Sequence, residues 1–101
     1  MASKSYIRAA LRRAIYARDG LACVYCGQIA KRRSIDHIKP TSAGGKTVAK
    51  NLVMCCLSCN RFKAGWPVDL FAELMARKGY GTKVAILGRL YARITRPLPK
   101  A

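Results

Sequence analysis

Acidic residues are scarce in this chain: Asp and Glu together number 4, against 20 Lys and Arg, in 101 residues. The formal net charge is therefore +16. Residues 1–18 and 77–100 each contain several basic side chains, and neither range contains an acid. An excess this large predicts a polyanionic partner, and nucleic acid is the first candidate. An anionic membrane surface, or a surface that is basic only for solubility, is the alternative interpretation.

Long apolar runs are also missing. No stretch approaches the roughly 18 apolar residues of a membrane span, so the sequence predicts no transmembrane segment. The N-terminal segment lacks the apolar core and small-residue cleavage site of a signal peptide, so we expect none, and we expect a cytoplasmic protein. Apolar residues nevertheless make up 51% of the chain, which excludes a disordered basic tail. The length predicts one domain over residues 1–101, with a thin core that a metal or a disulfide would help to hold.

The first half of the chain predicts a helix followed by two short strands. Apolar residues recur at helical spacing over residues 4–18, and the turn signal Asp19-Gly20 ends that helix. Residues 34–38 alternate between apolar and polar, which is typical of a half-buried strand. Residues 52–54 form a second apolar run, which we expect to be the returning strand.

The second half predicts three helices, so the fold class is α+β. The first of them is expected over residues 57–64, with Gly65 as its C-terminal cap. The next is expected to have Pro67 at its first helical position, and the last is expected to be capped by Thr82. We expect a core over about residues 8–63 and a C-terminal helical extension over about residues 67–96.

Five cysteines form two Cys-x2-Cys pairs with one left over. The pairs Cys23–Cys26 and Cys56–Cys59 supply the ligand set of a tetrahedral structural zinc, which would fold the chain and leave no open coordination position. Disulfides are the alternative, but the odd number of cysteines and the expected lack of a signal peptide argue against them. Cys55 could compete with Cys56, although the spacing to Cys59 favours Cys56, and we expect Cys55 to be a small apolar core residue.

The chain has one histidine, His37, which directly follows Asp36. Its side chain is the only one here whose ordinary pKa lies near neutral pH, so it is the natural candidate for a general base. A lone histidine in a small protein is more often structural or solvated than catalytic. The interpretation of His37 therefore depends on its surroundings.

Those surroundings resemble the HNH endonuclease family, in the subgroup whose ββα-metal motif is framed by a four-cysteine zinc site. The resemblance extends over about residues 8–63, and residues 64–101 add nothing to it. It depends on the segments Ile15-Tyr16-Ala17-Arg18-Asp19-Gly20, Cys23-Val24-Tyr25-Cys26-Gly27, Ser34-Ile35-Asp36-His37-Ile38-Lys39-Pro40, Gly44-Gly45, Asn51-Leu52-Val53-Met54-Cys55-Cys56 and Cys59-Asn60-Arg61-Phe62-Lys63.

The resemblance implies a metal-dependent DNA endonuclease of phages or bacteria, in which His37 activates water and Asp36 binds a divalent ion. Asn51 would fix the loop and orient His37, since an amide donates and accepts hydrogen bonds without titrating. Many family members have a second histidine at the last motif position, where this chain has Asn60. An amide oxygen still binds a hard cation, so we expect Mg²⁺ or Mn²⁺ on Asp36 and Asn60.

Contacts to DNA are expected from basic side chains on the helices. For Lys63, the sequence supports a phosphate contact and a solvated helix position equally. The main alternative is a non-catalytic zinc module that binds DNA or RNA, which would not need Asp36, His37 and Asn51 together; a membrane-surface or scaffold protein is a third. We expect no membrane or small-molecule partner, and the oligomeric state stays open. The expected DNA contacts are Arg8, Arg12, Arg61, Lys63, Arg89 and Arg93.

Overall fold

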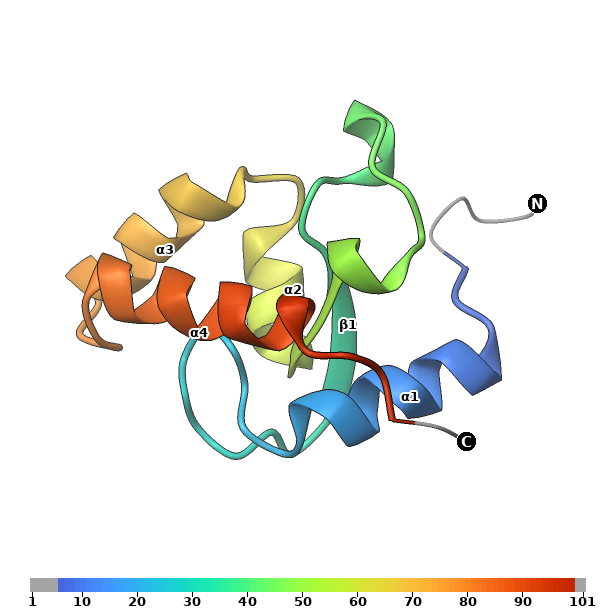
Figure 1. The fold of residues 1–101 in the computed structure, drawn as a ribbon. Coiled ribbons are helices and arrows are strands. Elements are labelled where there is room, and N and C mark those ends of the chain that lie inside the picture. Colours follow the sequence, from blue (N-terminus) through green and yellow to red (C-terminus); the bar gives the residue numbers. More distant parts are fainter. Residues whose placement is uncertain (1–5, 100–101) are drawn as a thin grey trace.

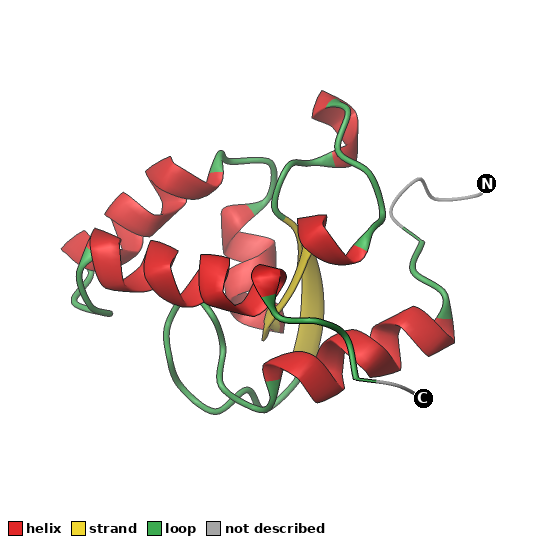
Figure 2. Ribbon diagram, viewed as in Figure 1, coloured by secondary structure: helices red, strands yellow, loops and turns green. Residues whose placement is uncertain are grey.

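The computed structural model describes residues 6–99, and it confirms the α+β class with a two-stranded antiparallel sheet (Figures 1 and 2). Helices surround the two strands (Figure 2). The elements are, in order, α1 (Ala9–Asp19), β1 (Arg33–His37), the 3-10 turns η1 (Thr41–Ala43) and η2 (Ala49–Asn51), β2 (Leu52–Cys56), α2 (Leu57–Lys63), α3 (Val68–Arg77) and α4 (Lys83–Thr95).

The hairpin of β1 and β2 separates two apolar clusters. The strands pair from Arg33 opposite Cys56 to His37 opposite Leu52, and successive side chains point to opposite faces. One face packs against α1, and the other packs against the cysteine turn after α1 and against α3 and α4. The first cluster contains Ile7, Ile15, Ile35, Leu52 and Met54, and the second contains Tyr25, Val53, Phe71, Met75, Ile86 and Leu90.

A buried ion pair attaches the end of α1 to β2. The Arg18 guanidinium contacts the Asp19 carboxylate at 2.6 Å and donates to the Leu52 carbonyl oxygen at 2.6 Å. Asp19 in turn accepts a hydrogen bond of 2.8 Å from the Met54 backbone N–H. α4 lies alongside α3, and the chain that follows α4 returns to α1 (Figure 1), where Arg96 donates to the Arg18 carbonyl oxygen at 3.0 Å.

The N-terminal helix is shorter than predicted. It begins at Ala9 rather than at residue 4, and residues 4 and 5 lie outside the described part of the chain. Ile7 reaches the core before the helix starts, so its place in the apolar pattern does not require helical backbone. The helix ends at the predicted Asp19-Gly20 turn, where Gly20 has a φ of 76°.

The later helices follow the prediction with one wrong cap. α2 ends at Lys63, and the residue with positive φ at its end is Ala64 (49°), not Gly65 as expected. Pro67 is the residue just before α3 rather than its first helical residue. The predicted cap of α4 is confirmed, because the Thr82 hydroxyl oxygen accepts a hydrogen bond of 3.0 Å from the backbone N–H of Ala85.

Two arginines of α4 that were expected to contact DNA instead bind backbone carbonyl groups. Arg93, which is 8% exposed, donates to the carbonyl oxygens of Met54 at 3.3 Å and Ala22 at 2.7 Å. The Arg89 side chain donates to the carbonyl oxygen of Val24 at 2.9 Å. These bonds connect α4 to β2 and to the turn between α1 and β1, so the expected DNA contacts of Arg89 and Arg93 are corrected to structural ones.

Replacing Arg93 with methionine should therefore destabilise the protein by about 1–3 kcal/mol, because the Ala22 carbonyl would lose its donor and the Met54 carbonyl would keep only the longer bond of 3.4 Å from the Val24 backbone N–H. The matched control is Arg77→Met, whose side chain is 77% exposed and which should change stability by no more than about 0.5 kcal/mol. Urea unfolding of the zinc-loaded proteins measures both. Equal stability of the two variants would contradict a structural role for Arg93.

Candidate functional site

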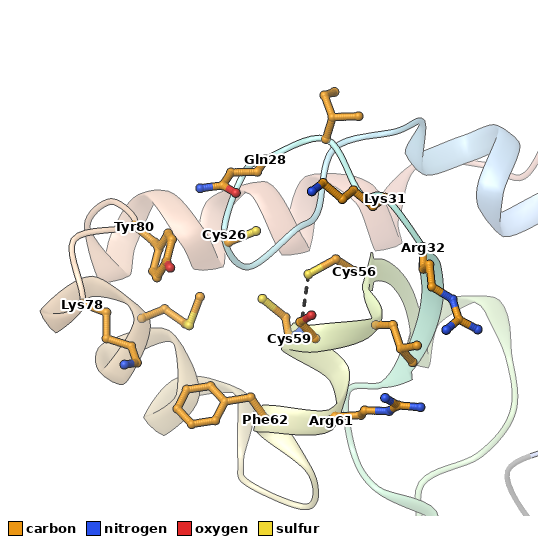
Figure 3. A pocket seen from close by; sticks show the side chains of 14 residues that line it. Cys26, Gln28, Lys31, Arg32, Cys56, Cys59, Arg61, Phe62, Lys78 and Tyr80 are labelled. Carbon is orange, nitrogen blue, oxygen red and sulfur yellow. Dashed lines mark hydrogen bonds between the residues drawn. The ribbon is translucent and has the colours of Figure 1, made fainter.

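The four paired cysteines converge at one point. Their sulfur atoms all lie within 4.8 Å of one another, although Cys23 and Cys26 precede β1 whereas Cys56 and Cys59 lie at the junction of β2 and α2. The backbone N–H groups of Tyr25 and Cys26 donate to the Cys23 sulfur at 3.4 and 3.5 Å, and that of Cys59 donates to the Cys56 sulfur at 3.4 Å (Figure 3). This arrangement is a zinc-type site, as the spacing predicted.

The electrostatics of the cluster favour a bound cation. A hydrogen bond with the Cys59 side chain, assisted by backbone N–H groups, lowers the pKa of Cys23 to about 4. The same bond and burial raise the pKa of Cys59, because a second thiolate so near the first is unfavourable. A bound metal ion removes that conflict, since cysteine binds metal as the thiolate. Cys55 lies outside the cluster, and burial in the core raises the pKa of its thiol, which agrees with the expected apolar role.

A groove of about 710 Å³ lies beside the cysteine cluster (Figure 3). Tyr80 and Lys78 line one end of it, and Arg32 and Arg61 line the other. The Lys78 ammonium lies 5.4 Å from the centre of the Phe62 ring. Neither the histidine nor any carboxylate lines this groove, so it is not where the predicted chemistry is placed.

A smaller pocket, of about 290 Å³, brings together most of the residues predicted for catalysis and for the catalytic ion, but Asn51 does not line it. Asp36 and His37 reach it from the end of β1, Asn60 reaches it from α2, and Arg12 reaches it from α1. Adjacent strand residues point to opposite faces, but four successive residues of β1, Ser34 to His37, line this pocket, so it runs along the strand. The pocket therefore places a nitrogen base, a carboxylate, an amide and a cation together.

His37 is 9% exposed, and its Nε2 atom lies 2.9 Å from the Thr47 hydroxyl. Burial and the charge of Lys63 lower the pKa of His37, and they outweigh the opposing effect of Asp36. The imidazole is therefore neutral near neutral pH, which is the form that accepts a proton. Nothing in the sequence singled out Thr47, because a threonine in a loop carries no signal of the side chain that it will meet.

Asn51 fixes the loop that carries Thr47. Its Oδ1 atom accepts from the Lys39 backbone N–H at 2.8 Å, and its Nδ2 atom donates to the carbonyl oxygens of Lys39 at 3.0 Å and Lys46 at 2.9 Å. A Cβ atom on Gly45 would lie 1.8 Å from the Lys39 carbonyl oxygen, so only glycine fits there. Asn51 has no bond to His37 among the described residues; it acts on the loop around the histidine.

Asp36 is held by partners inside the protein. It is 5% exposed, and it accepts a hydrogen bond of 2.6 Å from the Tyr25 hydroxyl. Lys63 has no exposed surface, and its Nζ atom lies 3.1 Å from Asp36 Oδ2. Burial raises the pKa of Asp36, while Lys63 and Tyr25 oppose that rise. The prediction for Lys63 is therefore wrong in both of its forms: the lysine is neither solvated nor placed to meet a phosphate.

Asn60 lies on the same side of the hairpin as Asp36. Its Nδ2 atom donates to the Ser34 hydroxyl at 2.6 Å and to the Ile35 carbonyl oxygen at 3.2 Å. With the nitrogen committed to β1, the amide oxygen is the atom that Asn60 offers to a ligand. Asp36 and Asn60 both line the small pocket, and both carry oxygen atoms of the kind that hard divalent ions prefer as ligands.

Of the remaining basic residues expected to contact DNA, Arg12 has the clearest position. It lines the small pocket and donates to the Tyr16 hydroxyl at 3.3 Å. Arg8 precedes α1 and is exposed, and Arg61 is exposed on α2. These three side chains are accessible to an anionic partner, unlike Lys63 and Arg93.

Residues 23–69 match the model of a family described as HNH endonuclease. The matched segment contains all four cluster cysteines together with Asp36, His37, Asn51 and Asn60. This part of the chain is similar to an HNH endonuclease domain. No curated protein matches the chain.

Within the described residues, no helix is long and apolar enough to cross a membrane.

The zinc-type site should hold one zinc ion per chain, measured by elemental analysis. Cys26→Ser should lose the metal and unfold, because structural zinc contributes about 10 kcal/mol or more to the folding of small domains. The matched control is Cys55→Ala, which should retain one zinc because Cys55 lies outside the cluster. A zinc-free Cys26→Ser protein that is as folded as the wild type would contradict this assignment, as would loss of zinc from Cys55→Ala.

The single histidine allows a direct measurement of the pKa shift. In an NMR titration of the zinc-loaded protein without other divalent ions, the His37 ring signals should change with a midpoint below the ordinary 6.5. The sign follows from burial, which disfavours the imidazolium form and so extends the neutral form to lower pH. A midpoint above 6.5 would show that Asp36 dominates over burial and Lys63.

Proposed function

We propose that this chain is an HNH-type, metal-dependent DNA endonuclease that hydrolyses phosphodiester bonds with His37 as the general base. The observation that supports this most strongly is the small pocket shared by His37, Asp36 and Asn60. A module that only binds nucleic acid has no need for a neutral, oriented imidazole beside a carboxylate. The zinc-type site stands apart, and its role is to fold the chain.

The two oxygen donors, Asp36 and Asn60, fit a hard divalent ion, and Mg²⁺ or Mn²⁺ is the expected cofactor. When bound, the ion stabilises the charge that develops on the phosphate and on the departing oxygen. The Asp36 carboxylate and the Asn60 amide oxygen would hold it. The bonds from Tyr25 and from Asn60 to β1 fix these two donors in place.

His37 acts on the attacking water. The Thr47 hydroxyl bonds Nε2 and so fixes the plane of the ring. The other ring nitrogen, Nδ1, then takes the proton from a water molecule in the pocket as that water attacks the phosphorus atom. Because burial keeps the imidazole neutral, the base is ready at neutral pH. Arg12 lines the same pocket and supplies a positive charge for the phosphate.

The large positive charge favours DNA binding through the backbone. Lys63, Arg89 and Arg93 have partners inside the protein, but most of the basic side chains are on the surface. We assign Arg8, Arg12 and Arg61 to DNA phosphates, which carry no direct sequence information. Binding should therefore depend steeply on salt and little on sequence.

Cleavage of supercoiled plasmid in Mg²⁺ or Mn²⁺ tests the proposal. His37→Ala should lose at least about 100-fold in rate, because it lacks the general base. Its binding to the same DNA, measured without divalent ions, should equal that of the wild type, since His37 is not a phosphate contact. Cleavage by His37→Ala at the wild-type rate would show that another group is the base. A folded wild type that binds DNA and never cuts it would instead indicate the non-catalytic zinc module.

A further inference from the structure

Lys63 is the most unusual charged residue in the described part of the chain. Its side chain has no exposed surface, and lysine is almost never fully buried unless it is paired. The Nζ atom lies 3.1 Å from Oδ2 and 3.4 Å from Oδ1 of Asp36. Asp36 is the carboxylate to which the proposed function assigns the divalent ion, so this lysine shares its partner with the ion.

The charges around the small pocket do not favour a cation by itself. Asp36 contributes one negative charge, and the buried Lys63 balances it at contact distance. Arg12 adds a positive charge to the pocket wall, whereas Asn60 is neutral. Among the residues that the structure describes, Asp36 is the only acid that lines this pocket. A divalent ion beside Asp36 would also lie close to the Lys63 ammonium in a region shielded from water, where repulsion between like charges is strong.

A phosphate group changes this balance. A phosphodiester brings one negative charge and unesterified oxygen atoms, which are suitable ligands for a hard ion. It would also offset the positive charge of Arg12 at the pocket wall. The ion would then have an anionic partner that the protein does not itself supply.

We propose that Lys63 neutralises Asp36, so that the pocket binds its divalent ion tightly only together with a phosphate of the DNA. This proposal rests on the proposed function and makes Lys63 a positioning residue that acts through Asp36. By linkage, the ion and the DNA must each raise the affinity of the protein for the other. Free protein would then hold little of the ion.

The alternative is that Lys63 only stabilises the fold and orients Asp36. The two roles predict opposite changes in the affinity for metal. Groups bonded to a metal ligand change metal affinity by about 10- to 100-fold, and loss of a purely orienting group weakens binding. Loss of a neutralising cation instead strengthens binding, because the carboxylate charge becomes available to the ion. Since Lys63 also opposes the rise in the pKa of Asp36 that burial causes, the comparison is made at a pH high enough to keep Asp36 ionised in both proteins.

Mn²⁺ is a suitable probe, because EPR measures the free ion directly. In zinc-loaded protein without DNA, Lys63→Met should bind Mn²⁺ at least about tenfold more tightly than the wild type. The matched control is Lys50→Met, which removes an exposed lysine and should leave the affinity unchanged. An affinity of Lys63→Met that equals or falls below that of the wild type would overturn the proposal.

Lys63→Met leaves Asp36 buried without its partner, so circular dichroism must first show that the variant is folded. A second measurement does not need this variant. Adding a short DNA duplex to His37→Ala protein, which cannot cut it, should tighten Mn²⁺ binding at least about tenfold. The same DNA with the double variant His37→Ala and Asp36→Asn corrects for ions held by the DNA itself. No tightening relative to this control would overturn the proposal.

These results are separable from the test of the proposed function. Mn²⁺ affinity without DNA does not depend on whether the bond is cut. Efficient plasmid cleavage together with unchanged Mn²⁺ affinity in Lys63→Met would overturn only the role of Lys63. A wild type that never cuts DNA would overturn the proposed function.

Discussion

The close approach of the four paired cysteine sulfurs is the constraint on which the rest of the structure depends. The sulfur atoms lie within 4.8 Å of one another, although 29 residues separate Cys26 from Cys56. Thiolates this close repel one another unless a cation neutralises them, so we expect metal binding and folding to be one process. The turn that carries Cys23 also supplies Val24 and Tyr25 to the main apolar cluster, against which α3 and α4 pack. A chain of this length has little other core to replace that attachment.

Helix α2 connects the cysteine site to the small pocket. Its seven residues include the zinc-site ligand Cys59, the amide Asn60 and the buried Lys63. Asn60 bonds to β1 beside Asp36, and Lys63 pairs with Asp36 itself. The position of α2 is set where Cys56 ends β2, so the zinc-type site fixes the distance between the helix and the strand. Loss of zinc should therefore disturb the pocket even though no cysteine lines it.

The sequence was most informative where the chemistry is local. Cysteine spacing predicted the zinc-type site. The motif also singled out Asp36, His37 and Asn60, and the fold brings these three residues to one pocket. The strands and most helices followed from apolar periodicity and turn residues. The cap of α2 was misplaced by one residue, because Ala64 adopts a φ of 49° that alanine rarely takes and that no pattern indicates.

Long basic side chains were the main source of error, because their partners are distant in sequence. Arg93 binds the carbonyl oxygen of Ala22, 71 residues away, and Lys63 binds Asp36, 27 residues away. A basic residue on an amphipathic helix looks the same in sequence whether it faces solvent or a buried acceptor. Thr47 was not predicted for a similar reason. Its hydrogen bond with His37 forms only in the loop conformation that Asn51 and Gly45 set.

The central claim is that two metal sites have separate tasks: the cysteine site holds the fold, and the small pocket performs the chemistry. The most direct test is to remove the weakly held divalent ions from the zinc-loaded protein and to follow plasmid cleavage and zinc content together. We predict that cleavage stops while zinc stays at one per chain, and that adding Mg²⁺ or Mn²⁺ restores cleavage at once. Cleavage that continues without added divalent ion, or that returns only when zinc is supplied, would contradict the account.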